Sequence, residues 1–190
     1  MSYNISNTDA PTGDSKFFNE VGVNKDLTFA GAAYVDDTYK AIDFHYEKDG
    51  KKIHDRVFEV TAINENWDTT IEKEQAKVAK RISHHLQAIL PGQVFNHAVG
   101  SFKELADAVV LDTNVAKGNS KVNVKLLYNK GKKFLGFPKN GGYFIEPANT
   151  PEQNSKIVPT AWEKKNRFTP AETPATDEAT ATTGEGKSYV

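Results

Sequence analysis

The stretch AIDFHYEKDGKKIHDRVFEVT, from Ala41 to Thr61, decides the fold of this chain. Two runs of alternating apolar and polar residues flank an Asp-Gly dipeptide, which is a favoured two-residue type I′ turn of β-hairpins. The turn fixes the register of the two strands and predicts one largely apolar face and one face with two opposite-charge pairs. The expected partners are Tyr46 with Ile53, Phe44 with Asp55 and Ile42 with Val57 on the first face, and Glu47 with Lys52, His45 with His54 and Asp43 with Arg56 on the second.

Two helices are predicted after this hairpin, because the spacing of apolar residues changes from every second residue to a helical period. The first helix is expected from Asp68 to Leu90, with Thr69 in a capping box. The second is expected from Phe102 to about Lys117. Ser101 caps its start and Gly118 ends it.

Strands are predicted on both sides of these elements. Leu27–Val35 precedes the hairpin, and Val122–Tyr128 follows the helices. A turn at Lys130-Gly131 then leads to a last strand over Lys133–Phe137, which Tyr143–Ile145 extends. Three strands, a helical insertion and two strands are the order of an OB-fold. We therefore expect a mainly β, α+β protein: a five-stranded OB-fold barrel with two helices between strands 3 and 4.

Composition divides the 190 residues into one domain and two arms. Residues 1–16 are polar and predict a flexible N-terminal arm, residues 17–147 the OB-fold domain, and residues 148–190 a polar, mildly acidic and largely disordered C-terminal tail. Two alternatives stay open for the stretch that contains Ile157 and Trp162: it docks on the domain or forms a short recognition segment. The start resembles no signal peptide, so we expect an intracellular protein.

The net charge of −1 does not indicate a binding partner, but the local distribution of charge does. Between Lys117 and Lys139 there are seven lysines and no acidic residue, and aromatic side chains lie among them and just beyond. Proteins that bind single strands combine cations that follow the phosphates with rings that stack on bases. A solvated face that protects an edge strand is the alternative explanation. The candidate binding residues are Arg56, Lys121, Lys125, Lys130, Lys132, Lys133, Phe134, Lys139 and Tyr143.

Strand alternation predicts which of these side chains face solvent. Lys125 and Phe134 are expected to point outward, and Tyr128 and Phe137 inward. Phe134 is therefore the preferred stacking residue. Each phosphate contact releases counterions, so binding is expected to weaken steeply as salt rises.

Several segments resemble phage-encoded OB-fold single-stranded DNA-binding proteins. The resemblance covers about Phe17 to Pro147 and rests on five short stretches: Phe18–Val23, Phe44–Lys51, Val122–Asn129, Phe134–Pro138 and Phe144–Pro147. It implies a protein in the host-cell cytoplasm that coats single-stranded DNA during phage DNA replication, recombination or repair. It also implies contacts with replication or recombination proteins through the tail, although this tail is less acidic than is usual in the family.

No catalytic, cofactor or metal site is expected. The absence of cysteine excludes disulfides, thiolate zinc sites and cysteine nucleophiles. His45 and His54 face each other in the predicted hairpin, but zinc requires three or four convergent ligands. The main alternative function is a virion or assembly protein whose OB-like domain binds other proteins or forms a homo-oligomer. A carbohydrate-binding or hydrolytic module is a third possibility, suggested only by the fold and by some scattered carboxylates.

Overall fold

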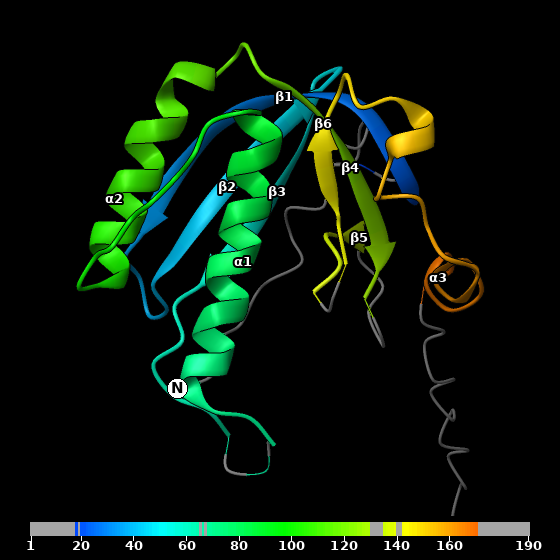
Figure 1. Cartoon of the computed structure of the whole chain (residues 1–190). Coiled ribbons are helices and arrows are strands. Elements are labelled where there is room, and N and C mark those ends of the chain that lie inside the picture. The colour runs from blue at the N-terminus through cyan, green and yellow to red at the C-terminus, as the bar shows by residue number, and fades with distance from the viewer. Residues whose placement is uncertain are drawn as a thin grey trace, which may run out of the picture.

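The structure, a computed structural model, describes residues 18, 20–64, 66, 68–129, 135–139 and 142–170. In these residues the chain is an α+β protein with one open sheet of six antiparallel strands and three α-helices (Figure 1). The expected arm 1–16 and the chain after residue 170 lie outside the described residues. The elements are β1 (Gly22–Val35), β2 (Ala41–Lys48), β3 (Lys51–Phe58), α1 (Ile71–Ile89), α2 (Phe102–Thr113), the 3₁₀ turn η2 (Asn114–Ala116), β4 (Lys121–Tyr128), β5 (Leu135–Gly136), β6 (Ile145–Pro147), the 3₁₀ turn η3 (Glu152–Asn154) and α3 (Ala161–Arg167).

The β2–β3 hairpin has the predicted turn and register. Asp49 and Gly50 both have positive φ, 52° and 75°, as a type I′ turn requires. All six expected cross-strand pairs are observed. The prediction is therefore confirmed. It could be made from the sequence because the turn residues and the alternation are both local signals.

Strand β1 is longer than predicted and pairs with two neighbours. It begins at Gly22 rather than Leu27, and the register shifts between Asn24 and Leu27 against β4 and between Phe29 and Gly31 against β2. Gly31 has a φ of 130°, which favours glycine. Polar residues at the first bulge interrupt the apolar alternation, so the sequence pattern conceals the start of the strand.

The predicted closed barrel of five strands is not observed. The strands are ordered β3-β2-β1-β4-β5, with β6 also paired to β4, so β3 and β5 lie at opposite ends of the order. In the described residues no pairing joins these two ends. Helix α1 packs against both β3 and β6, and it therefore lies where strand pairing would close a barrel (Figure 1).

Both predicted helices of the insertion are present, with adjusted ends. Helix α1 is capped by Thr70, whose side chain accepts a hydrogen bond from the backbone N–H of Lys73, rather than by the expected Thr69. The Ser101 cap of α2 is confirmed. The two helices lie over the same face of the sheet (Figure 1). This inner face supplies most of the core, which includes Leu27, Phe29, Ile42, Phe44, Tyr46, Val57, Ile82, Leu86, Ile89, Val122, Val124 and Leu126.

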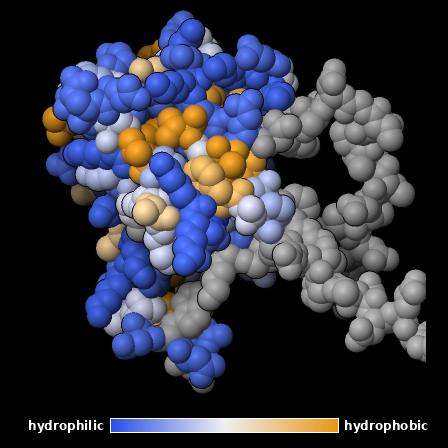
Figure 2. All heavy atoms as spheres, turned by 90° about the vertical axis from the view of Figure 1, so that its right-hand side faces the viewer, coloured by the Kyte–Doolittle hydropathy of each residue, from blue (hydrophilic) through white to orange (hydrophobic). Residues whose placement is uncertain are grey.

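The segment after residue 147 packs against the domain as far as it is described. Ile157 is fully buried, and the Arg167 guanidinium donates a hydrogen bond to the Tyr128 carbonyl. The docking alternative for this segment is therefore the observed one, and α3 is a helix that the sequence analysis did not predict. The side of the molecule that carries α3 is mostly hydrophilic, with apolar side chains gathered near its middle (Figure 2).

A candidate nucleic-acid interface on the outer face of β2 and β3

The outward side chains of β3 are all cationic, aromatic or imidazole. Lys52, His54, Arg56 and Phe58 are exposed, while the residues between them point toward the core. The alternation follows from the strand period of two. We call these four residues, with His45 of β2 and Tyr39 of the preceding loop, the β3 face.

One end of the β3 face is aromatic. The rings of Phe58 and Tyr39 are 44% and 72% exposed and meet edge to face, with centroids 6.3 Å apart. Within the described residues no element covers either side chain, although burying them would be favourable. Exposed ring faces of this kind can stack on unpaired bases.

The middle of the β3 face holds two cross-strand pairs. The imidazoles of His45 and His54 lie with centroids 5.7 Å apart. Burial lowers the pKa of His45; the carboxylate of Asp43 opposes this shift, and three nearby side chains add to it. His45 is therefore neutral at neutral pH. These three side chains are His54, Arg56 and Lys52.

Arg56 is held in a fixed orientation by Asp43. Its Nε and Nη2 donate to the two carboxylate oxygens at 2.7 and 2.6 Å. The hydrogen bond to Asp43 raises the pKa of Arg56. A guanidinium plane fixed this way needs no further ordering before it stacks on a base or donates to a phosphate.

The opposite end of the β3 face continues across the sheet. Thr28 of β1 pairs with both Glu47 and Lys121, and Glu47 pairs with Lys52, so one row crosses four strands. Lys121, a predicted site residue, is exposed at the end of this row. The structure thus places Lys121 and Arg56 on the same outer face, where Asp43 and Glu47 balance much of the positive charge.

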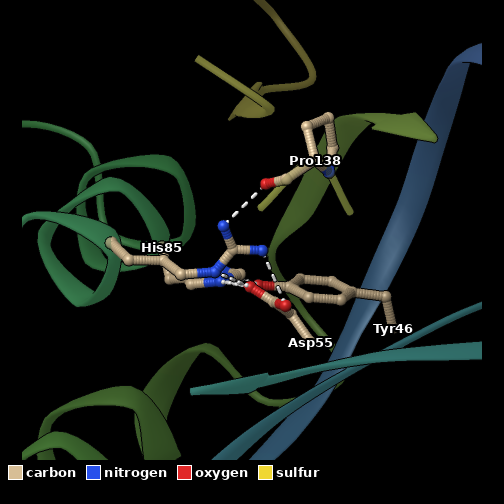
Figure 3. A network of polar contacts seen from close by, with 5 residues as sticks. Tyr46, Asp55, His85 and Pro138 are labelled. Atoms are coloured by element: carbon tan, nitrogen blue, oxygen red, sulfur yellow. Dashed lines mark hydrogen bonds and ion pairs between the residues drawn. The ribbon is translucent and has the colours of Figure 1, made fainter. Parts of the chain in front are cut away.

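Beneath the β3 face lies a buried polar network (Figure 3). Tyr46 Oη is 2.6 Å from His85 Nδ1, and His85 Nε2 is 2.7 Å from Asp55 Oδ2. Arg81 donates to both oxygens of Asp55 at 2.7 and 2.8 Å, and to the carbonyl oxygen of Pro138 at 2.7 Å. The network thus connects β2, β3, α1 and the chain after β5.

The protonation states of the network follow from its partners. A carboxylate only accepts, so His85 Nε2 carries the proton, and Nδ1 accepts from the Tyr46 hydroxyl. Burial lowers the pKa of His85 and raises that of Tyr46, so both are neutral. Burial raises the pKa of Asp55, but His85 and Arg81 together outweigh it and hold this pKa below its ordinary value.

This network holds β3 in place and is not a site for a reactant. Tyr46 and His85 are fully buried, and Asp55 is nearly so. A Tyr-His-Asp row resembles a proton relay, but no substrate reaches any of its three members in this structure. The sequence predicted the outward charges of β3 and not this network, because its partners lie 26 to 57 residues apart.

The expectation that Lys125 offers its ammonium group to a phosphate needs correction. Lys125 points to the outer face as predicted, but it is only 4% exposed, and its Nζ lies 2.9 and 3.2 Å from the carboxylate oxygens of Glu163. Helix α3 covers this part of β4. The sequence analysis assigned that helix to the tail, so the partner was missed.

The other predicted site residues are dispersed. Tyr143 is 41% exposed, but one ring face stacks on His84 and the Nζ of Lys156 lies over the ring, 4.8 Å from its centroid. Lys139 is exposed beside Pro138. Phe137 is buried, in line with its inward prediction. Four predicted residues lie outside the described part of the chain: Lys130, Lys132, Lys133 and Phe134.

Phe58, Tyr39 and the histidine pair were missed as site residues. The hairpin register carried a usable signal, because Phe58 follows Arg56 by two residues and must share its face. In the described residues no group of three or more side chains is arranged to hold a metal ion. Nor does any described helix have the length and apolar character to cross a membrane.

Comparisons with protein-family models, with curated proteins and with solved structures find no match for this chain.

Proposed function

We propose that this chain is a single-stranded DNA-binding protein that coats unpaired DNA during replication, recombination or repair and catalyses no reaction. The strand order supports an OB-type fold that is open between β3 and β5. In OB-folds the face of the second and third strands binds oligonucleotides. The β3 face lies on the corresponding strands.

The observation that carries the proposal is the exposed sequence of side chains along β3. From Lys52 to Phe58 the strand extends about 20 Å. It presents a cation, an imidazole, a fixed guanidinium and a ring, and Tyr39 adds a second ring. Cations that contact phosphates and rings that stack on bases are the two components of sequence-independent single-strand binding.

The charge balance of the β3 face favours stacking over phosphate contacts. Asp43 and Glu47 offset the nearby cations, so few counterions are released on binding by this face. We therefore expect a shallower salt dependence than the lysine-rich stretch alone predicts. Duplex DNA keeps its base faces stacked inside, so it should bind this face more weakly.

The decisive experiment measures binding of a labelled poly-dT oligonucleotide by fluorescence anisotropy. Replacing Phe58 by alanine removes one stacking ring and should weaken binding about 5- to 150-fold, since stacking contributes about 1–3 kcal/mol per base. Trp162→Ala is the matched control, because Trp162 is an exposed aromatic on α3. A chain that ignores poly-dT refutes the function; equal binding by Phe58→Ala refutes the face.

One observation favours the alternative of a protein-docking domain. Leu111 and Val115 at the C-terminal end of α2 and in η2 are largely exposed, and a cavity of about 410 Å³ lies beside Leu111 and Tyr34. Exposed apolar side chains grouped around a hollow often mark protein contacts. Light scattering combined with the poly-dT titration distinguishes the two functions, because the alternative expects a defined oligomer that does not bind DNA.

A further inference from the structure

A second concave site lies on the other side of the sheet from the β3 face, between α1, β6 and η3. It encloses about 180 Å³. We call it the Tyr143 pocket. Its lining residues are His84, Gln87, Ala88, Tyr143, Ile145, Glu146, Pro147, Thr150, Asn154 and Lys156, with aromatic and polar side chains prominent among them.

An aromatic stack forms one wall of the Tyr143 pocket. The rings of His84 and Tyr143 are nearly parallel, with an interplanar angle of 23° and centroids 4.8 Å apart. Lys156 places its ammonium group over the Tyr143 ring. Lys156 is an exposed, flexible side chain, so a flat ligand can take its place on the ring while the ammonium group moves to the ligand's edge.

The pocket offers a ligand the ammonium group of Lys156 and, within the described part of the chain, one buried polar atom without a partner. His84 Nδ1 is buried and has no hydrogen-bond partner in the described residues. Burial lowers the pKa of His84, and the charge of Lys80, one helical turn earlier, lowers it further. The carboxylate of Glu146 accepts from the Ser155 hydroxyl and the Lys156 backbone N–H, so both its oxygens already have donors within the protein.

The volume limits the ligand to a small one. At about 30 Å³ per water, 180 Å³ corresponds to roughly six water molecules. Pockets for larger organic ligands are about 300 Å³ or more. The Tyr143 pocket therefore accommodates one flat ring, and the rest of a larger ligand would lie outside it.

We propose that the Tyr143 pocket binds the base of a single nucleotide, stacked on Tyr143, while the sugar and phosphate lie outside the pocket, beside Lys156. The existence of the pocket does not depend on the proposed function. The choice of a nucleotide, among compounds that carry a ring and a phosphate, does rest on it. The pocket and the β3 face are separate sites, because α1 covers the inner face of the sheet and the β3 face lies on the outer one. Each site can therefore be lost without the other.

The test is a titration of the full chain with dTMP, thymidine and inorganic phosphate, followed by NMR signals of His84 and Tyr143. We expect dTMP to bind more tightly than either fragment. Tyr143→Leu should weaken dTMP binding about 5- to 150-fold, as expected for a lost stacking contact. Lys156→Gln, at an exposed position that tolerates change, should weaken it up to about fivefold. Lys165→Gln on α3 is the control for removal of one positive charge.

The outcomes separate this inference from the proposed function. Saturable dTMP binding that survives Phe58→Ala and is lost in Tyr143→Leu supports the pocket, whether or not poly-dT binds. If poly-dT binds and dTMP does not, the pocket is wrong and the function stands. Phosphate binding as tight as dTMP binding also overturns the inference, because the base then contributes nothing. Lys156→Gln decides the matter if Tyr143→Leu fails to fold.

Discussion

Two adjacent residues of β3 form the same kind of ion pair on opposite sides of the sheet. Asp55 points inward and pairs with Arg81, while Arg56 points outward and pairs with Asp43. Both pairs are bidentate, with N–O distances of 2.6 to 2.8 Å. The arginine side chain is 17% exposed in the inner pair and 42% exposed in the outer one.

The two pairs have the same geometry and differ in exposure, so we expect exposure to solvent to decide how much each pair contributes to stability. The inner pair is surrounded by the core and by His85, so either partner alone would be a charge without compensation. The outer arginine stays hydrated whether or not Asp43 is present. We therefore expect the inner pair to determine stability and the outer pair to determine binding.

The largest expected effect comes from Asp55→Ala. Removal of this carboxylate leaves Arg81 and His85 without their partner, and should lower the free energy of unfolding by about 3–5 kcal/mol. Asp43→Ala is the matched control and should cost less than about 1 kcal/mol. Urea unfolding of both variants measures the difference. Equal losses would contradict the contrast between the two pairs.

The next effect is a loss of stability on acidification. The folded chain holds the pKa of His85 and of Asp55 below their ordinary values, so the unfolded chain takes up more protons as pH falls. Stability should therefore decline from about pH 6.5 downward through His85, and further below about pH 4 through Asp55. Each proton contributes at most about 1.4 kcal/mol per pH unit.

Urea unfolding between pH 8 and pH 3 checks this prediction. His45 and His84 also have a lowered pKa and act in the same direction, so a variant is needed to isolate His85. His85→Gln should flatten the decline between about pH 6.5 and 5 relative to the original chain, and leave the loss near pH 4. An unchanged slope would mean that His85 does not titrate with unfolding.

A smaller effect is expected from Tyr46→Phe, which keeps the buried ring and removes only the hydroxyl. His85 Nδ1 then loses its donor, and the free energy of unfolding should fall by about 1 kcal/mol. Thermal unfolding monitored by circular dichroism measures the change. A more stable variant would show that this hydrogen bond is not formed.

The smallest expected effect is on binding by the outer pair. Asp43→Asn removes one negative charge from the β3 face and frees Arg56 for a phosphate, so poly-dT affinity should rise by up to about fivefold at low salt. The gain should shrink as salt screens the face. Weaker binding by this variant would contradict the prediction and show that the orientation Asp43 gives to Arg56 outweighs the effect of its negative charge.

Local signals account for the part of the fold that the sequence predicted. The Asp49-Gly50 turn sets the hairpin register, and Ser101 sets the start of α2. Long-range contacts account for what was missed. The start of β1 depends on pairing with β4, and α3 is held in place by Lys125 from 38 residues earlier in the chain.

The candidate site also has residues that local signals predicted and residues whose accessibility depends on long-range contacts. Arg56 was found because the hairpin register placed it opposite Asp43, and the same register contained the signal for Phe58. The lysine-rich stretch was read as one surface, but sequence distance does not show that Lys125 is covered while Lys121 is exposed. Residue type predicted the chemistry, and only the packing of the C-terminal segment determined which cations remain accessible.

The Arg81 side chain joins two parts of the sheet that are not paired with each other in the described residues: β3, through Asp55, and the chain after β5, through Pro138. Across every other line through the sheet, separation means breaking a ladder of backbone hydrogen bonds. Along this line the described residues offer the hydrogen bonds of one guanidinium group and the packing of the Phe137 ring on Tyr46 and His85. Because β3 pairs with one strand and β1 with two in the described residues, amide protons of β3 should exchange with deuterated solvent sooner than those of β1, and local unfolding should begin at this edge.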